Sequence, residues 1–184
     1  AAFREKMDIH TVTASQVFSV LPEQVTSLQR RNAKAVNFGI VYGISEFSLA
    51  EDIGVSRYEA KEYIDSYLEK YKGVKRYMKK VVETARDTGY TETLFGRKRW
   101  IPELKSTNFN IRQGAERMAL NTPIQGTAAD LIKLAMIRVD KALEENFPEA
   151  KLLLQVHDEL IVECPTEIAQ DVAALISDEM ENVK

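Results

Sequence analysis

The chain has 184 residues, and 45% of them are hydrophobic, which is ordinary for a globular protein able to build a core. Lys and Arg number 25 against 28 Asp and Glu, and the net charge of -3 excludes a protein that is basic all over, so any nucleic-acid surface must be local. No apolar run approaches the roughly 20 residues of a membrane span, and the single Cys164 predicts a structural thiol in a reducing cytoplasm.

The first segment, residues 1–20, has a helical pattern and contains one of the two histidines, His10. A lone histidine in such a run is more often a helix cap or a surface residue than a ligand. The pattern by itself therefore assigns His10 no role.

The next helix is predicted at about residues 27–43. Thr26 and Gln29 have the spacing of a capping box, and Gly43 is a typical C-terminal stop. At helical spacing, one stripe carries cations and an aromatic ring, and a second stripe is small and apolar. The first stripe consists of Arg30, Lys34, Asn37, Phe38 and Val41, and the second of Ala33, Val36 and Ile40. The helix therefore has one face to bury and one face to offer to a ligand.

The cationic stripe has the chemistry of a nucleotide site. Arg offers a fork of donors that matches phosphate oxygens, Lys offers a point charge, and the Phe38 ring offers a surface for a sugar or a base. From charge spacing alone, a solvated basic helix with Phe38 and Tyr42 in the core is the more frequent structure. Spacing leaves both alternatives open.

The residue identities in this stretch are more specific than their spacing. Arg30, Lys34, Phe38, Tyr42 and Gly43 together resemble motif B of the family A DNA polymerases, the DNA polymerase I type. The resemblance continues, with the family's other motifs in the family's order, over essentially all of the chain. It implies a binding site for the incoming deoxynucleoside triphosphate, in which Lys34 also takes part in catalysis. The residues of this site would be His10, Arg30, Lys34, Phe38 and Tyr42.

Three further helices are predicted after the motif B helix. The first ends at Gly54, the second begins at the capping box of Ser56 and Glu59, and the third covers residues 74–89. The resemblance implies that residues 1–104 form a helical fingers subdomain. Five cations gather near the start of the third helix, namely Lys72, Lys75, Arg76, Lys79 and Lys80.

Residues 90–102 break the helical period and predict a short hairpin or loop. This segment carries Arg97, Lys98, Arg99 and Trp100. Cations beside an indole suit a single-stranded template or a phosphate backbone, and a solvated turn anchored by Trp100 is an equally good interpretation. The polymerase family usually has Tyr where this chain has Trp100.

A long helix is predicted from Asn108, with a kink or interruption near Asn121, because Pro123 lacks an N–H and crowds the carbonyl one turn earlier. Arg117, Asn121 and Gln125 follow one another at one-turn intervals, as on a solvated edge. The resemblance instead implies that these three side chains contact the DNA minor groove and the template and primer strands. Minor-groove acceptors are nearly degenerate, which suits an enzyme that accepts every correct base pair.

Two strand-like runs, residues 152–156 and 160–164, predict a tight hairpin with His157, Asp158 and Glu159 at its tip. Adjacent carboxylates on a turn favour a hard cation such as Mg²⁺, although a simple polar tip is commoner. The hairpin resembles motif C of the same polymerases. That resemblance implies that Asp158 is a catalytic metal ligand, that Glu159 contributes more weakly to metal binding and catalysis, and that His157 contacts the primer strand.

The predicted fold class is α+β and mostly helical, with helical fingers and, over residues 105–184, a partial palm subdomain. The palm part would contain the kinked long helix, the motif C hairpin with the metal-site carboxylates, and an amphipathic terminal helix. The first residues resemble the segment that follows motif A. Motif A itself, the thumb and the last palm strand are absent from the 184 residues.

The resemblance implies a DNA-directed DNA polymerase that adds deoxynucleotides to a primer 3′ end in replication and repair, through phosphoryl transfer assisted by two Mg²⁺ ions. The expected partners are primer–template DNA and deoxynucleoside triphosphates, with no membrane, and a cytoplasmic monomer is expected. Because the motif A Asp is absent, the chain alone is expected to be inactive. Phe38, where Tyr would also fit, predicts discrimination against dideoxynucleotides.

Two other functional classes remain open. A nucleic-acid-binding module would need only the basic helix and the Trp100 loop, and would be indifferent to Mg²⁺ and to Asp158→Ala. A metal-dependent hydrolase built on His157, Asp158 and Glu159 would need further ligands at a recognisable spacing, and the only other histidine is His10.

Overall fold

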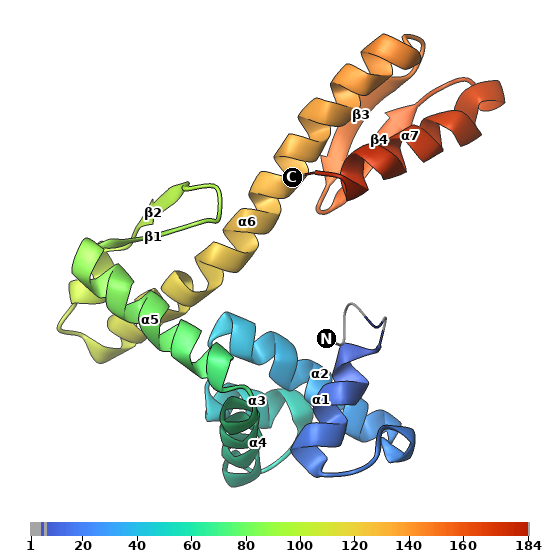
Figure 1. The fold of residues 1–184 in the computed structure, drawn as a ribbon. Helices are drawn as coiled ribbons and strands as arrows, with labels where there is room; N and C mark the ends of the chain where they lie inside the picture. Colours follow the sequence, from blue (N-terminus) through green and yellow to red (C-terminus); the bar gives the residue numbers. More distant parts are fainter. Residues whose placement is uncertain (1–4, 6, 184) are drawn as a thin grey trace. The chain divides into compact units, whose positions relative to one another are not determined.

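The computed structural model describes residue 5 and residues 7–183. These residues are mostly helical, with two small antiparallel hairpins, which confirms the predicted fold class (Figure 1). The chain divides into two compact units: unit 1 is Ala1–Glu92 with Gly96–Ile124, and unit 2 is Thr93–Phe95 with Gln125–Lys184. Within the described part of the chain, no helix is long and apolar enough to cross a membrane.

Unit 1 begins with five helices and a short 3₁₀ turn. The capping box of Thr26 is present and Gly43 ends the helix in the left-handed region, so the predicted motif B helix is confirmed as α2. The capping box of Ser56 likewise starts α4. The elements are α1 (Ile9–Phe18), the 3₁₀ turn Pro22–Gln24, α2 (Ser27–Tyr42), α3 (Glu46–Ile53), α4 (Arg57–Lys70) and α5 (Lys72–Thr88).

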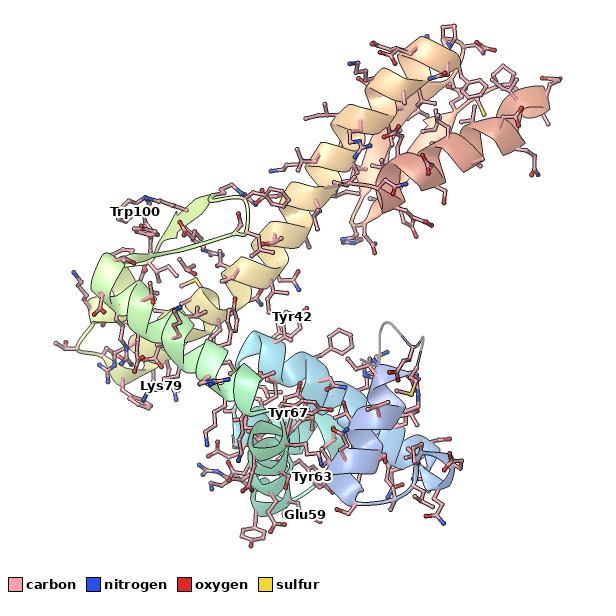
Figure 2. The ribbon with its side chains drawn as sticks, in the orientation of Figure 1. Tyr42, Glu59, Tyr63, Tyr67, Lys79 and Trp100 are labelled. Atoms are coloured by element: carbon pink, nitrogen blue, oxygen red, sulfur yellow. The ribbon has the colours of Figure 1, made fainter. Side chains whose placement is uncertain are left out.

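The apolar face of α2 packs on the other helices of unit 1. Val36 and Ile40 join Leu49 and Ala60 in one buried cluster. Tyr63 and Tyr67 of α4 pack against this cluster, as Figure 2 shows, whereas Tyr58 of the same helix is 71% exposed. Burial of α2 on one side leaves its opposite, cationic side for a ligand.

Helix α5 begins two residues before its predicted start. Tyr71 is both the C-cap of α4 and the N-cap of α5, with φ of -102° and ψ of 61°, so a single residue joins the two helices. Gly73 is therefore helical rather than part of a turn. The helix ends at Gly89 in the left-handed region, as predicted.

The predicted hairpin around Gly96 is present: β1 (Tyr90–Glu92) pairs antiparallel with β2 (Lys98–Trp100). A 3₁₀ turn, Pro102–Lys105, leads into α6 (Phe109–Asn146). Of the two outcomes predicted near Asn121, the interruption is wrong, because α6 is continuous through Pro123, and the kink stays a prediction. Pro123 has no N–H to donate to the carbonyl of Ala119, one turn earlier. This carbonyl instead accepts a hydrogen bond of 3.3 Å from the buried Thr91 hydroxyl.

Unit 2 contains the rest of α6, a second hairpin and the last helix. The hairpin strands are β3 (Lys151–Val156) and β4 (Glu159–Glu163), followed by the 3₁₀ turn Thr166–Ile168 and α7 (Ala169–Glu181). Val139 and Leu143 of α6 pack with Val172 of α7 and with Ala150, which precedes β3, into a small core. The division into fingers over 1–104 and palm over 105–184 stays a prediction.

Candidate functional site

Four side chains of α2 lie at intervals of one turn and face away from its buried stripe. Arg30, Lys34, Phe38 and Tyr42 are all exposed, and the two rings keep 49% and 44% of their surface accessible. Rings of this size are usually buried, and contiguous exposed apolar surface often marks a binding site. Of the two alternatives that spacing left open, the one with Phe38 and Tyr42 in the core is therefore wrong, and the ligand-facing one is favoured.

The Arg30 guanidinium is held by Asp8, the N-cap of α1. Asp8 accepts hydrogen bonds from Arg30 Nε at 2.6 Å and from Nη2 at 3.2 Å, and it also caps the backbone N–H groups of His10 and Thr11. The hydrogen bond from Arg30, followed by that from the Thr11 hydroxyl, holds the pKa of Asp8 well below its usual range. One carboxylate thus fixes Arg30 relative to the start of α1.

The imidazole of His10 is oriented by Asn37, which lies on α2. The Thr13 hydroxyl donates to Asn37 Oδ1 at 3.1 Å, so the amide nitrogen faces His10 Nδ1, at 3.0 Å. Nδ1 is then the acceptor, and the ring proton belongs to Nε2. Burial, followed by the cations Arg30 and Lys34, lowers the pKa of His10 against the opposing effect of Asp8, so the free ring is neutral at pH 7.

These contacts bring four of the five predicted nucleotide-binding residues together. The rings of His10 and Phe38 lie 5.8 Å apart between centroids, and Lys34 Nζ lies 5.8 Å from the Phe38 centroid. Asp8 and Asn37 position two of these residues; sequence reasoning missed Asp8, and it placed Asn37 on the ligand-facing stripe without a role toward His10. The Asp-x-His-Thr run was a visible capping signal for Asp8, whereas the role of Asn37 depends on a contact across 27 positions.

Tyr42 lines a second part of the site together with Arg117 of α6. A cavity of about 500 Å³ lies between Phe38, Tyr42 and Arg117, and its polar lining comes from Ser45, Ser48 and Asp52. Arg117, predicted to contact DNA, is thus in the same cavity as the predicted nucleotide residues. The cavity has the volume of a small-ligand site and offers both rings and a guanidinium.

Gly43 permits the close approach of α2 to α6 in this region. Its φ is +66°, and an added Cβ would lie 3.1 Å from Arg117 Cγ and 3.3 Å from Leu120 Cδ1. We expect Gly43→Ala to destabilise the chain by about 1–2 kcal/mol through the left-handed strain, with a further loss from the contact. Urea unfolding measures the change.

Gly54→Ala is the matched control for Gly43→Ala. Gly54 has φ of +70° and ends α3, but a Cβ there would meet nothing within 4 Å. Both variants have the strain of a non-glycine residue at positive φ, and only Gly43→Ala also has the tight contact of the new Cβ with Arg117 and Leu120. Equal losses in the two variants would contradict a tight approach to Arg117.

Two further predicted DNA contacts, Asn121 and Gln125, lie on α6 after Arg117. Asn121 is half-buried and belongs to unit 1, whereas Gln125 is exposed and belongs to unit 2. Their joint role at a minor groove stays a prediction.

The tip of the β3–β4 hairpin carries the predicted metal residues of unit 2. Val156 pairs with Glu159, so only His157 and Asp158 form the turn and Glu159 is the first residue of β4, which corrects the prediction of three tip residues. His157 has φ of +55°, a strained value for a residue that is not glycine, and such strain is typical of functional sites.

The two carboxylates of this hairpin fit part of a site for a hard cation. Asp158 and Glu159 are both exposed and adjacent, and their oxygens are the ligands that Mg²⁺ prefers. Among the described residues, no group of three or more His, Cys, Asp or Glu side chains could hold a metal ion. The hairpin therefore offers two ligands of the right chemistry and needs further ligands from elsewhere.

Comparisons with known proteins agree with this picture. The model of DNA polymerase family A matches residues 1–184. DNA polymerase I of Streptococcus pneumoniae (strain R6) is 55% identical over 181 residues, which are 98% of this chain and 21% of that protein, and DNA polymerase I of Bacillus caldotenax is 53% identical over 180 residues, or 98% of this chain and 20% of that protein. The chain thus spans about a fifth of the length of these relatives.

A solved structure is similar over the whole chain. It is described as the POL domain of Pol1 from M. smegmatis in complex with DNA primer-template and dNTP. The TM-score is 0.91 and the sequence identity 43%, and the similarity covers 100% of this chain and 32% of that chain.

Proposed function

Because the chain belongs to DNA polymerase family A, we propose that it is the nucleotide-handling part of a DNA-directed DNA polymerase of the DNA polymerase I type. In this proposal the whole protein extends a primer 3′ end with deoxynucleotides during replication and repair, and it works in the cytoplasm on primer–template DNA. The observation that carries the proposal is the cluster of His10, Arg30, Lys34 and Phe38 on one exposed face.

Each member of this cluster has a distinct task toward a nucleoside triphosphate. Arg30, whose fork is aimed by Asp8, and Lys34 bind the phosphates, and His10 donates from Nε2 to a phosphate oxygen. Phe38 supports the sugar, and Tyr42 lies near the templating base. Arg117, Asn121, Gln125 and His157 contact the DNA.

Asp158, with a weaker contribution from Glu159, would hold Mg²⁺ in the complete enzyme. The bound cations would neutralise phosphate charge and favour the deprotonated primer hydroxyl. The chain's own residues supply positioning: they align the triphosphate and hold its charge while the hydroxyl attacks. Since the second carboxylate position, in motif A, is absent from these 184 residues, we propose that the chain alone does not polymerise.

Primer extension tests the proposal. The 184-residue chain is compared with a longer polypeptide that restores motif A, the thumb and the last palm strand, using Mg²⁺ and all four deoxynucleotides. We expect extension by the longer polypeptide alone. If neither polypeptide extends the primer, although the longer one is shown to be folded, a nucleic-acid-binding module is favoured. Extension by the 184-residue chain would overturn the proposed inactivity.

We expect nucleotide affinity to rise as the pH falls below 7. Burial and the cations lower the pKa of free His10, and a bound triphosphate opposes that effect, so binding favours uptake of a proton at Nδ1, with the Asn37 amide turned so that its oxygen accepts from the ring. The dissociation constant of the 184-residue chain for a deoxynucleoside triphosphate is measured across the pH range. His10→Gln is the control, since it keeps the titration of the phosphates; an identical pH dependence in both would exclude His10.

Phe38→Tyr is expected to ease dideoxynucleotide incorporation by the longer polypeptide. The exposed Phe38 ring has no hydroxyl, and a Tyr hydroxyl would supply a hydrogen bond that the missing sugar hydroxyl cannot. A neutral hydrogen bond of about 1 kcal/mol predicts roughly a fivefold change in the ratio of dideoxy to deoxy incorporation. The rate with deoxynucleotides is the internal control. An unchanged ratio of dideoxy to deoxy incorporation would show that Phe38 does not contact the sugar.

A further inference from the structure

The start of α5 carries a basic stripe that the nucleotide site does not use. Residues 72–80 contain five cations and no carboxylate, and all five cations are exposed. Their spacing of three and four residues places them on one side of the helix. The basic stripe consists of Lys72, Lys75, Arg76, Lys79 and Lys80.

The charges of the basic stripe are hardly compensated within the described part of the chain. Lys79 has an ion pair with Glu83, at 3.7 Å between side chains that are 77% and 58% exposed, and the other four cations have none with any residue that the structure describes. Like charges one turn apart repel one another. A bound anionic partner would offset this repulsion, because each cation would then lie close to a negative charge.

The groove beside the basic stripe contains an aromatic ring as well as cations. Arg76, Tyr77, Lys79 and Lys80 line a groove of about 420 Å³ together with one carboxylate, Glu83, which pairs with Lys79, and Tyr77 keeps 46% of its surface accessible. Gly73 also lines the groove, and a Cβ there would meet nothing within 4 Å, so no packing contact requires a glycine. Figure 2 labels Lys79 on this helix. A groove with cations and an exposed ring is the pattern of single-strand binding sites, because an unpaired base offers its face to the ring.

We propose that the basic stripe of α5, with Tyr77, binds the backbone and one base of single-stranded DNA, namely the unpaired template strand. The inference rests on the proposed polymerase function, which supplies such a strand. The cations neutralise successive phosphates and Tyr77 stacks on an unpaired base. A duplex would satisfy the cations alone, since its base faces are covered.

The test is fluorescence anisotropy of the full 184-residue chain with a labelled oligothymidylate of about 16 nucleotides. The stripe variant is Lys75→Gln, Lys79→Gln and Lys80→Gln. We expect the slope of log affinity against log salt concentration to become shallower by about 2, with at least about tenfold weaker binding at low salt. Tyr77→Ala should weaken binding by about tenfold without changing the slope, and Tyr77→Phe should restore it.

A control variant makes the same change in net charge elsewhere. Lys61, Lys141 and Lys151 become Gln; each has a carboxylate nearby, from Asp65 at 2.9 Å, from Glu145 at 3.8 Å and from the cross-strand partner Glu163. We expect less than half of the slope change of the stripe variant. Equal changes in the two variants would overturn the proposal, as would equal or tighter binding of a duplex of the same length.

A second measurement needs no variant. Saturating oligothymidylate should slow the acetylation of Lys75, Lys79 and Lys80 in the native chain, read by mass spectrometry, and should leave Lys61 unchanged; equal protection of all four would overturn the proposal.

Nucleotide binding by Lys34→Ala is measured in parallel with DNA binding by the stripe variant. If Lys34→Ala loses nucleotide affinity while the stripe variant binds DNA normally, the proposed DNA binding by the basic stripe is contradicted and the polymerase proposal stands. If instead Lys34→Ala keeps nucleotide affinity while the stripe variant loses DNA, the basic stripe stands and the proposed nucleotide site fails.

Discussion

Asp158→Ala in the longer polypeptide is expected to lower the rate of nucleotide incorporation by about a thousandfold or more, which corresponds to at least ~4 kcal/mol of barrier. The reason is electrostatic. Asp158 lies in a two-residue turn at an exposed hairpin tip and has the oxygen ligands that Mg²⁺ prefers, so its removal takes away a ligand where phosphate charge must be neutralised. Single-turnover incorporation with saturating DNA and nucleotide measures the loss.

Glu159→Gln is the control for Asp158→Ala. Glu159 is the neighbouring carboxylate but belongs to β4, where it pairs with Val156, and we expect a smaller loss, on the order of tenfold. Both variants should keep their affinity for primer–template DNA, because neither removes a cation. A polymerase that remains active without Asp158, while folded, would show that motif C does not hold the catalytic metal here.

Local signals in the sequence predicted much of the fold. The capping boxes at Thr26 and Ser56 and the stops at Gly43 and Gly89 set the bounds of helices that the structure confirms. These signals succeed because they act locally: the side chain of the N-cap residue at the start, or the backbone N–H of the glycine at the end, bonds to a backbone group only three or four residues away.

The errors come from contacts between residues that are distant in the sequence. Pro123 predicted an interruption of α6, but the hydroxyl of Thr91, from another element, serves the carbonyl of Ala119. The same limit applies to the site. The positions of the cations on α2 followed from helical spacing, whereas the hydrogen bond of Asn37 to His10 required the packing of α1 on α2.

Lys34→Ala in the longer polypeptide is expected to lower kcat/KM for deoxynucleotides by about 10- to 100-fold, because a hydrogen bond to a charged group contributes about 1.5–3 kcal/mol. The charges of the cluster explain why Lys34 has this weight. Asp8 compensates Arg30 in the free protein and His10 is neutral at pH 7, so Lys34 supplies the net positive charge that meets the triphosphate.

Arg31→Ala provides the matched control, since Arg31 is an exposed cation of the same helix but lies outside the stripe of Arg30, Lys34 and Phe38. Steady-state kinetics and DNA binding are measured for both variants. Lys34→Ala should lose nucleotide use and keep DNA affinity. Arg31→Ala should lose little nucleotide use, and Lys34→Arg should recover part of the nucleotide use that Lys34→Ala loses. Equal losses of nucleotide use and of DNA affinity in Lys34→Ala would place this lysine on the DNA rather than on the phosphates, and the cluster around His10 would then have to bind the triphosphate through Arg30 without Lys34.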